Sequence, residues 1–367
     1  MATTFKTLTN NDVISTRTLL HESSPLTGTI VSGTYADLNI KNYSHEMFQS
    51  VFDYPFLSSS ANHIFDITYG YSSVLSGTNG VGIGLAAGGA RVDNAKKLQM
   101  YNSMAQILVG HDSTGNIRRF DQDGNFDDTT SDKMDSVFFL NFSRLLTKDE
   151  IKKGSVKLQF MTGGTIEIQG TKAGPSTIQD ISGTNSFLVN SPAGEYGILY
   201  DTTRAATFTK VGLIYYQAGI AVITASIFGN ALGTPSGTLG SAEFGAGTHT
   251  ITKTDVNHVI NSGTIEQIAD GVRNRIYNMS FNNTVELNST IYFCRLNHND
   301  YNYSSNPTYI TGSRIRAKNV STDQPVAYLT TVGLYSADNE LLAVAKLSEP
   351  LRKDPNTELT LRVRLDY

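Results

Sequence analysis

Two stretches near the C-terminus, residues 328–335 and 341–347, place apolar side chains at alternating positions. Alternation with a period of two predicts strands, and residues 336–339 supply the turn chemistry that joins them as a hairpin. Both faces of this hairpin are largely apolar, so we expect it to be covered on both sides, by its own domain or by another subunit. A last alternating run predicts one more strand, with the inward side chains Leu359, Leu361, Val363, Leu365 and Tyr367.

The middle of the chain consists of short alternating runs separated by Gly, Thr and Ser, which predicts an antiparallel β region from about residue 154 to 250. Further strands are expected at 136–143 and 156–169. The most apolar stretch, residues 211–229, contains Gln217 and Gly219, and we interpret it as a hairpin. The glycine-rich residues 229–250 are typical of an exposed loop.

Apolar residues recur at spacings of three and four between residues 92 and 109, which predicts a helix ended by Gly110. A second helix is expected near residues 264–276, where isoleucine and valine side chains line one side. Thr147 and Glu150 match a capping box, which predicts a short helix closed by Gly154.

These patterns together predict a mainly β protein with a few α-helices, built of antiparallel sheets arranged as a sandwich or barrel. A chain of 367 residues exceeds one typical domain. We divide it into four segments. They are an N-terminal arm with short strands (1–90), a helix-containing segment (91–153), a Gly/Thr-rich β region with a helical tail (154–277) and a C-terminal β framework (278–367).

Composition narrows the classes of function. Lys and Arg number 29 against 33 Asp and Glu, a balance that argues against a dedicated nucleic-acid surface. No apolar stretch reaches the roughly 18 residues of a membrane span, so we expect no membrane partner. Cys294, the only cysteine, fits a buried strand position and cannot form an internal disulfide.

Catalytic and cofactor motifs have a weak case. His45 and Glu46 begin like a zinc-protease motif, but Gln49 stands where the second histidine belongs. Gly80, Gly82 and Gly84 match a dinucleotide fingerprint only in a degenerate form and without a preceding buried strand. We therefore expect no enzyme activity, no cofactor and no catalytic residue.

One local cluster resembles a calcium loop, the run DQDGNFDD at residues 121–128. Asp121, Asp123, Asn125 and Asp127 offer oxygen atoms at alternating positions, but Phe126 occupies the position where an EF-hand needs glycine. A surface Asp-Gly turn is the favoured alternative, so calcium is only a weak candidate.

Aromatic side chains in the first 75 residues and apolar side chains of the C-terminal hairpin are candidates for interface anchors. For the aromatic group, a local core is the equal alternative. The candidates are Phe52, Tyr54, Phe56, Phe65, Tyr335, Leu342 and Val344.

Three segments, YPFLSSSANHIFDITYGYS, NDYNYSSNPTYITGS and YLTTVGLYSADNELLAVAKLSEPLRK, resemble virion structural proteins of contractile-tailed, myovirus-like phages of cyanobacteria. The middle run VGLIYYQAGIAVITASIF carries the same resemblance, which thus covers most of the chain. It implies a subunit of the virion, assembled in the host cytoplasm, without a catalytic role.

The resemblance implies other virion proteins as partners and leaves the position in the particle open; we expect the tail, baseplate or neck. Sheet edges and a two-sided hairpin that neighbouring subunits can complete lead us to expect a homo-oligomer of ring or point-group symmetry. Two alternatives are a receptor- or carbohydrate-binding β module at a tail tip and a capsid decoration protein. A hydrolase is the weakest interpretation.

Overall fold

The protein is described here by a computed structural model. The residues that the structure describes are 5–25, 40–52, 63–76, 93–126, 132–162, 173–203, 209–228, 263–273, 276–304, 310–311, 314–315, 322 and 325–367. The expected loop at 229–250 therefore lies outside the described residues.

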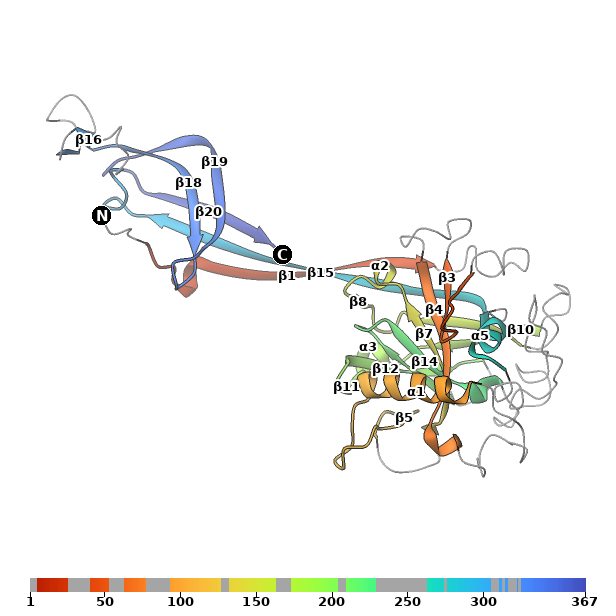
Figure 1. Cartoon of the computed structure of the whole chain (residues 1–367). Helices are drawn as coiled ribbons and strands as arrows, with labels where there is room; N and C mark the ends of the chain where they lie inside the picture. Colours follow the sequence, from red (N-terminus) through yellow and green to blue (C-terminus); the bar gives the residue numbers. More distant parts are fainter. Residues whose placement is uncertain are drawn as a thin grey trace. The chain divides into compact units, whose positions relative to one another are not determined.

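The chain forms two compact units. Unit 1 combines Met1–Leu19 with Glu286–Tyr367, and unit 2 is the continuous segment Leu20–Val285. The chain passes between the units twice, within strand β1 (Val13–Pro25) and within strand β15 (Ile276–Leu296) (Figure 1). The four segments expected from the sequence follow chain order, whereas unit 1 brings together residues from both ends.

Unit 2 is built around an antiparallel sheet in which five strands run in the order β12-β13-β14-β7-β4. Their bounds are Gly194–Asp201, Thr209–Tyr215, Ile220–Thr224, Ser136–Phe142 and His63–Tyr71. The sheet continues through β3 and β2 at one side and through β10, β9 and β15 at the other; the added bounds are Gln49–Phe52, Ile40–Asn42, Ala173–Gln179 and Lys157–Thr162. Four short strands complete the described part of unit 2, namely β5 (Phe120–Asp121), β6 (Lys133–Met134), β8 (Glu150–Ile151) and β11 (Leu188–Ser191).

This architecture confirms a mainly β fold with large antiparallel sheets that fit a sandwich. In the described part of the chain the strand order runs from β1 to β2 without closing on itself, so the barrel alternative is not found. The hairpin expected around Gly219 is confirmed, because β13 pairs antiparallel with β14 and Gly219 takes the positive φ of 70° that a tight turn requires.

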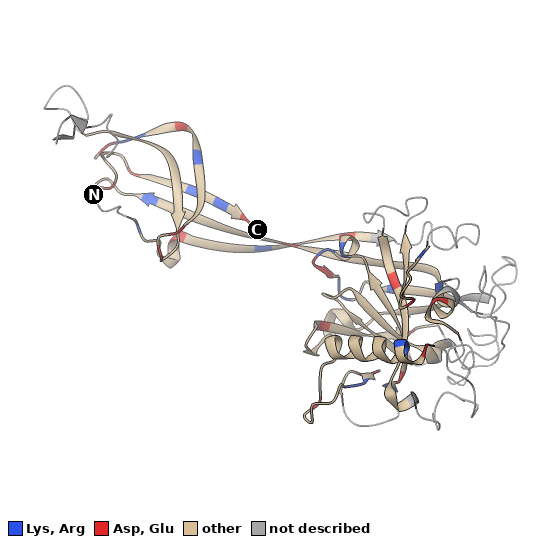
Figure 2. Ribbon diagram, in the orientation of Figure 1, with Lys and Arg blue, Asp and Glu red and all other residues tan. Residues whose placement is uncertain are grey.

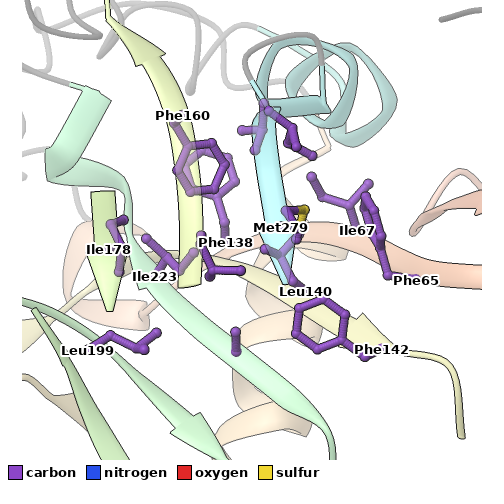
Figure 3. Close-up of a cluster of buried hydrophobic side chains, with 14 of the residues drawn as sticks. Phe65, Ile67, Phe138, Leu140, Phe142, Phe160, Ile178, Leu199, Ile223 and Met279 are labelled. Carbon is purple, nitrogen blue, oxygen red and sulfur yellow. The ribbon is translucent and has the colours of Figure 1, made fainter. Parts of the chain in front are cut away.

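Strand β7 explains why unit 2 has two cores. Phe138, Leu140 and Phe142 point into one cluster, while Val137 and Phe139 point into the other. A strand buried on both faces needs a nearly continuous apolar run, which SVFFLNF provides. The first cluster also takes side chains from β4, β9, β14 and β15, including Phe65, Phe160, Ile223 and Met279 (Figure 3).

Helices cover the two cores. Helix α1 (Asn94–Leu108) contributes Tyr101 and Ala105 to the second cluster, and helix α5 (Ile265–Arg273) contributes Ile268 to the first. Both confirm the expected helices. Gly110, at φ 84°, ends α1 by donating its N–H to the Ala105 carbonyl at 2.9 Å.

The expected helix from Thr147 to Gly154 is wrong. Thr147 is instead the last residue of helix α2 (Arg144–Thr147), and Glu150–Ile151 form strand β8 against β15. The Ile151 side chain is fully buried in the first core cluster. Tertiary burial of this one side chain thus overrides the local capping signal.

Unit 1 consists of long strands with little helix. Residues Ser289–Leu296 of β15 pair antiparallel with β20 (Leu359–Asp366), and β1 is the neighbour of β15 on its other side. Strands β18 (Ala327–Tyr335) and β19 (Leu341–Lys353) form a separate two-stranded sheet, which confirms the hairpin expected from the sequence. The short β16 (Ile310–Thr311) and β17 (Arg314–Ile315) pair with each other.

In the described ranges the remaining short helical elements are α3 (Gly183–Ser186) and the 3-10 turns Asn10–Asp12, Ser73–Ser76 and Ala225–Phe228. Among the described helices, none combines the length and the apolar character needed to cross a lipid bilayer.

Candidate functional site

The acidic run does not assemble the four expected ligands. Asp121 lies fully buried at the end of β5, and the Lys133 ammonium donates to its carboxylate at 2.5 Å. The Asn125 side-chain amide donates a hydrogen bond to the Asp123 carboxylate at 3.0 Å. This contact uses its nitrogen, whereas a calcium ligand would use its oxygen. Asp127 lies outside the described residues.

Asp132, which lies outside the run expected from the sequence, supplies the third carboxylate of this cluster. One oxygen each of Asp121, Asp123 and Asp132 lie within 4.8 Å of one another. Burial raises the pKa of Asp121 against the opposing effect of Lys133. For Asp123, hydrogen bonds from its neighbours and the charge of Lys210 outweigh burial and lower the pKa. The three carboxylates could offer oxygens to a cation, but Lys133 already places a positive charge among them.

Among the residues that the structure describes, the nearest approach to a nucleophile arrangement lies on the neighbouring strands β3 and β4. The Ser50 hydroxyl donates to Asp66 Oδ1 at 2.5 Å, and His63 Nε2 lies 2.8 Å from the same oxygen. The carboxylate therefore stands between the hydroxyl and the imidazole. A hydroxyl nucleophile needs the imidazole as its direct base, and this order does not provide it.

Unit 1 contains a pocket of about 320 Å³. Its lining is mostly apolar and comes from the N-terminal segment, β15, β18 and β20, including Phe5, Leu8, Phe293, Val332 and Leu361. Phe5 and Tyr335 both line this pocket, and the centroids of their rings lie 4.7 Å apart.

The charged groups of the pocket are paired within unit 1. Arg295 lies 2.8 Å from Asp12, and Lys6 lies 2.6 Å from Asp300. Cys294 also lines the pocket, half-buried where full burial was expected. Burial raises the pKa of its thiol, which disfavours the reactive thiolate.

The most unusual surface of unit 1 is its C-terminal hairpin. Leu342, Val344 and Tyr335 are 68%, 53% and 45% exposed, and Tyr328 and Leu341 are exposed to a similar degree. Among the described residues of unit 1, the buried apolar side chains are Val326, Ala327 and Val363.

The interface candidates from the sequence thus divide into three groups. Tyr335, Leu342 and Val344 are exposed on the hairpin. Phe52 and Phe65 are buried in unit 2, so the local-core alternative holds for these two residues. Tyr54, Phe56 and their neighbours lie outside the described residues.

Sequence reasoning missed Leu341 as an exposed position. A register shift between Leu334 and Tyr335 breaks the strict alternation, and Leu341 and Leu342 both become exposed. An alternation with a period of two places Leu341 and Leu342 on opposite faces of the strand. The sequence therefore could not indicate that both side chains are exposed.

No family model, no curated protein and no solved structure matches this chain. The geometry of unit 1 is therefore the main guide to function.

Proposed function

We propose that this chain is a non-enzymatic structural subunit of a tailed-phage virion, in the tail, baseplate or neck, and that it acts through protein–protein contacts of unit 1. The observation that carries the proposal is the apolar hairpin β18–β19, which leaves large side chains in water. Burying one such side chain contributes about 1.5–3 kcal/mol, and several of them together can offset the entropy lost on association.

The form of the hairpin supports association as well. An isolated two-stranded sheet is marginally stable in water, and three or more strands or a covering layer stabilise it. The described residues pair β18 only with β19. A neighbouring subunit would supply both the missing strand partner and the missing cover.

The phage setting rests on the resemblance of four segments, one of which includes the whole hairpin turn at residues 336–339. The other virion proteins are accordingly the proposed partners, and the virion, assembled in the host cytoplasm, is the proposed location. The strands of unit 1 carry charges of both signs, with Lys and Arg the more frequent (Figure 2). Over the whole chain, 29 Lys and Arg stand against 33 Asp and Glu, so the basic excess typical of a nucleic-acid surface is missing.

Recognition of a receptor or carbohydrate at a tail tip is the second candidate. It is favoured by the pocket of unit 1, where the partly exposed aromatic side chains of Phe5, Tyr301 and Tyr335 meet. Aromatic rings with nearby polar groups suit sugar rings. Capsid decoration remains an alternative location for the structural role.

Mild dissociation of purified phage particles followed by mass spectrometry tests the proposal. We expect stoichiometric copies of this chain in complexes with tail, baseplate or neck proteins. A small distal complex that binds cell-wall glycans would favour recognition instead. Absence of the chain from purified particles, or release of glycans by the isolated protein, would contradict a non-enzymatic virion subunit.

A further inference from the structure

The beginning of β19, together with the turn residue Glu340 before it, carries a self-complementary sequence. Residues 340–346 read Glu-Leu-Leu-Ala-Val-Ala-Lys, with opposite charges at the two ends and apolar residues between them. Glu340, Leu342, Val344 and Lys346 are all exposed. Within the described residues, neither Glu340 nor Lys346 takes part in an ion pair.

The edge is also free to pair. In the described part of the chain, β19 has one strand neighbour, β18, although it spans Leu341–Lys353. A long edge strand presents unpaired N–H and C=O groups that another strand can use. Pro350, which cannot donate a hydrogen bond, lies outside the 340–346 segment.

An antiparallel two-fold pairing centred on Ala343 brings complementary side chains of this segment together, and the two-fold axis repeats the register shift beside Leu342 at both ends of the contact. Glu340 faces Lys346 of the partner subunit, and Leu342 faces Val344 of the partner subunit. The long Leu341 faces the small Ala345 of the partner subunit. Opposite charges and apolar pairs directly across a sheet each stabilise it.

Neighbouring registers lose this match. Centring the pairing on Ala345 places Val344 across from Lys346 of the partner subunit, and centring it on Leu341 places Leu342 across from Glu340 of the partner subunit. Both put an apolar side chain across from a charge. A strand that carries lysine at its edge ordinarily resists pairing, but at the Ala343 register Glu340 neutralises that lysine.

We propose that β19 pairs with β19 of a second copy of this chain, antiparallel and centred on Ala343, to form a continuous four-stranded sheet β18-β19-β19-β18. The inference rests on the proposed assembly function and specifies its partner. The contact is isologous, because the same segment serves both subunits.

Charge reversal in the full chain tests the pairing. In Glu340→Lys two lysines face each other at each end of the contact, and in Lys346→Glu two glutamates do. Each variant should raise the dimer Kd, measured by light scattering and sedimentation, about tenfold. The double variant E340K/K346E restores opposite charges and should recover the Kd of the parent protein. Because both residues are exposed, circular dichroism should show unchanged folding.

Cross-linking tests the register. At the two-fold centre the Cα atoms of residue 343 lie about 4.5–5.5 Å apart in an antiparallel sheet, within reach of a disulfide. Ala343→Cys in a Cys294→Ser background should form a covalent dimer on mild oxidation. The control Thr330→Cys, exposed on β18 of the same hairpin, should stay uncross-linked.

A monomer at all concentrations, unchanged Kd in both single charge variants, or equal cross-linking at 330 and 343 would overturn the pairing. Particle composition separates this failure from that of the proposed function. A chain that is monomeric alone but present in purified particles refutes only the β19 contact, whereas a β19-paired dimer absent from particles refutes only the virion role.

Discussion

Lys97 is a buried lysine whose lowered pKa makes the free energy of unfolding depend on pH. It lies on α1 with its side chain fully buried, and its Nζ donates to the Gly263 carbonyl at 2.7 Å. Burial lowers its pKa to about 8, although the Asp93 carboxylate acts in the opposite direction. The ammonium form is therefore disfavoured in the folded protein relative to the unfolded chain.

The sign of the pH effect follows from this lowered pKa. Between pH 8 and the unfolded pKa of 10.5 the unfolded chain binds more protons, so the free energy of unfolding rises with pH. Lys97→Met should remove this rise, which amounts to about 3 kcal/mol. Chemical denaturation at pH 7 to 10 measures it. Lys96→Met removes a half-exposed lysine of the same helix, whose hydrogen bond to Glu46 raises its pKa where burial lowers that of Lys97. This control should keep the rise in the free energy of unfolding between pH 8 and 10, and equal slopes for all three proteins would contradict the prediction.

The Asp121–Lys133 pair gives a second prediction at this scale. Lys133→Met leaves a buried carboxylate uncompensated and should lower the free energy of unfolding by about 3–5 kcal/mol. The double variant D121N/K133M should recover most of this loss, as measured by urea denaturation. Because the Lys133 ammonium already occupies the buried Asp121 carboxylate, calcium should leave the melting temperature of the parent protein unchanged, and a rise of several degrees would refute that account.

At the scale of elements, Gly70 controls how closely α1 packs on β4. A Cβ atom at this position would lie 2.8 Å from the backbone nitrogen of Tyr101 and 3.0 Å from the backbone oxygen of Lys97. Backbone atoms of a helix cannot move aside as a side chain can, so α1 would have to shift off the sheet and disturb the second core cluster.

Gly70→Ala should therefore lower the free energy of unfolding by about 2–3 kcal/mol. Gly115→Ala is the comparison, since a Cβ atom there meets nothing within 4 Å and only its positive φ of 87° is strained. That variant should cost about 1 kcal/mol. If both substitutions cost the same in urea denaturation, close packing at Gly70 is not the limiting factor.

Elements with a clean period could be predicted from the sequence, and elements decided by distant contacts could not. The alternation in β18, β19 and β20 and the three-four spacing in α1 identified those elements. The Thr147–Glu150 signal failed because Ile151 is taken into a core formed by other segments. Asp132 was missed because the β5–β6 pairing, not local spacing, returns it to Asp121. Phe65 and Val344 both lie in apolar runs of the sequence that predict strands. Only the fold shows that Phe65 is buried and that Val344 is exposed.

At the scale of the whole molecule, the two units differ in how much apolar surface they bury. Unit 2 holds both core clusters, whereas the hairpin of unit 1 has exposed apolar side chains. Amides of β18 and β19 should therefore exchange with solvent at least tenfold faster than those of β7 and β13 in the dilute protein. Hydrogen exchange with mass spectrometry checks this, and protection of β19 should grow with protein concentration. Uniform protection across both units would contradict the difference.

The insertion of unit 2 as a continuous segment within unit 1 sets an order of events during synthesis. Residues 13–19 of β1 leave the ribosome long before residues 286–296 of β15, their strand partners, and closing so long a loop is entropically costly until unit 2 has folded. We expect nascent chains to complete unit 2 first and to form the apolar β18–β19 hairpin afterwards, which postpones contacts between subunits until unit 2 has folded.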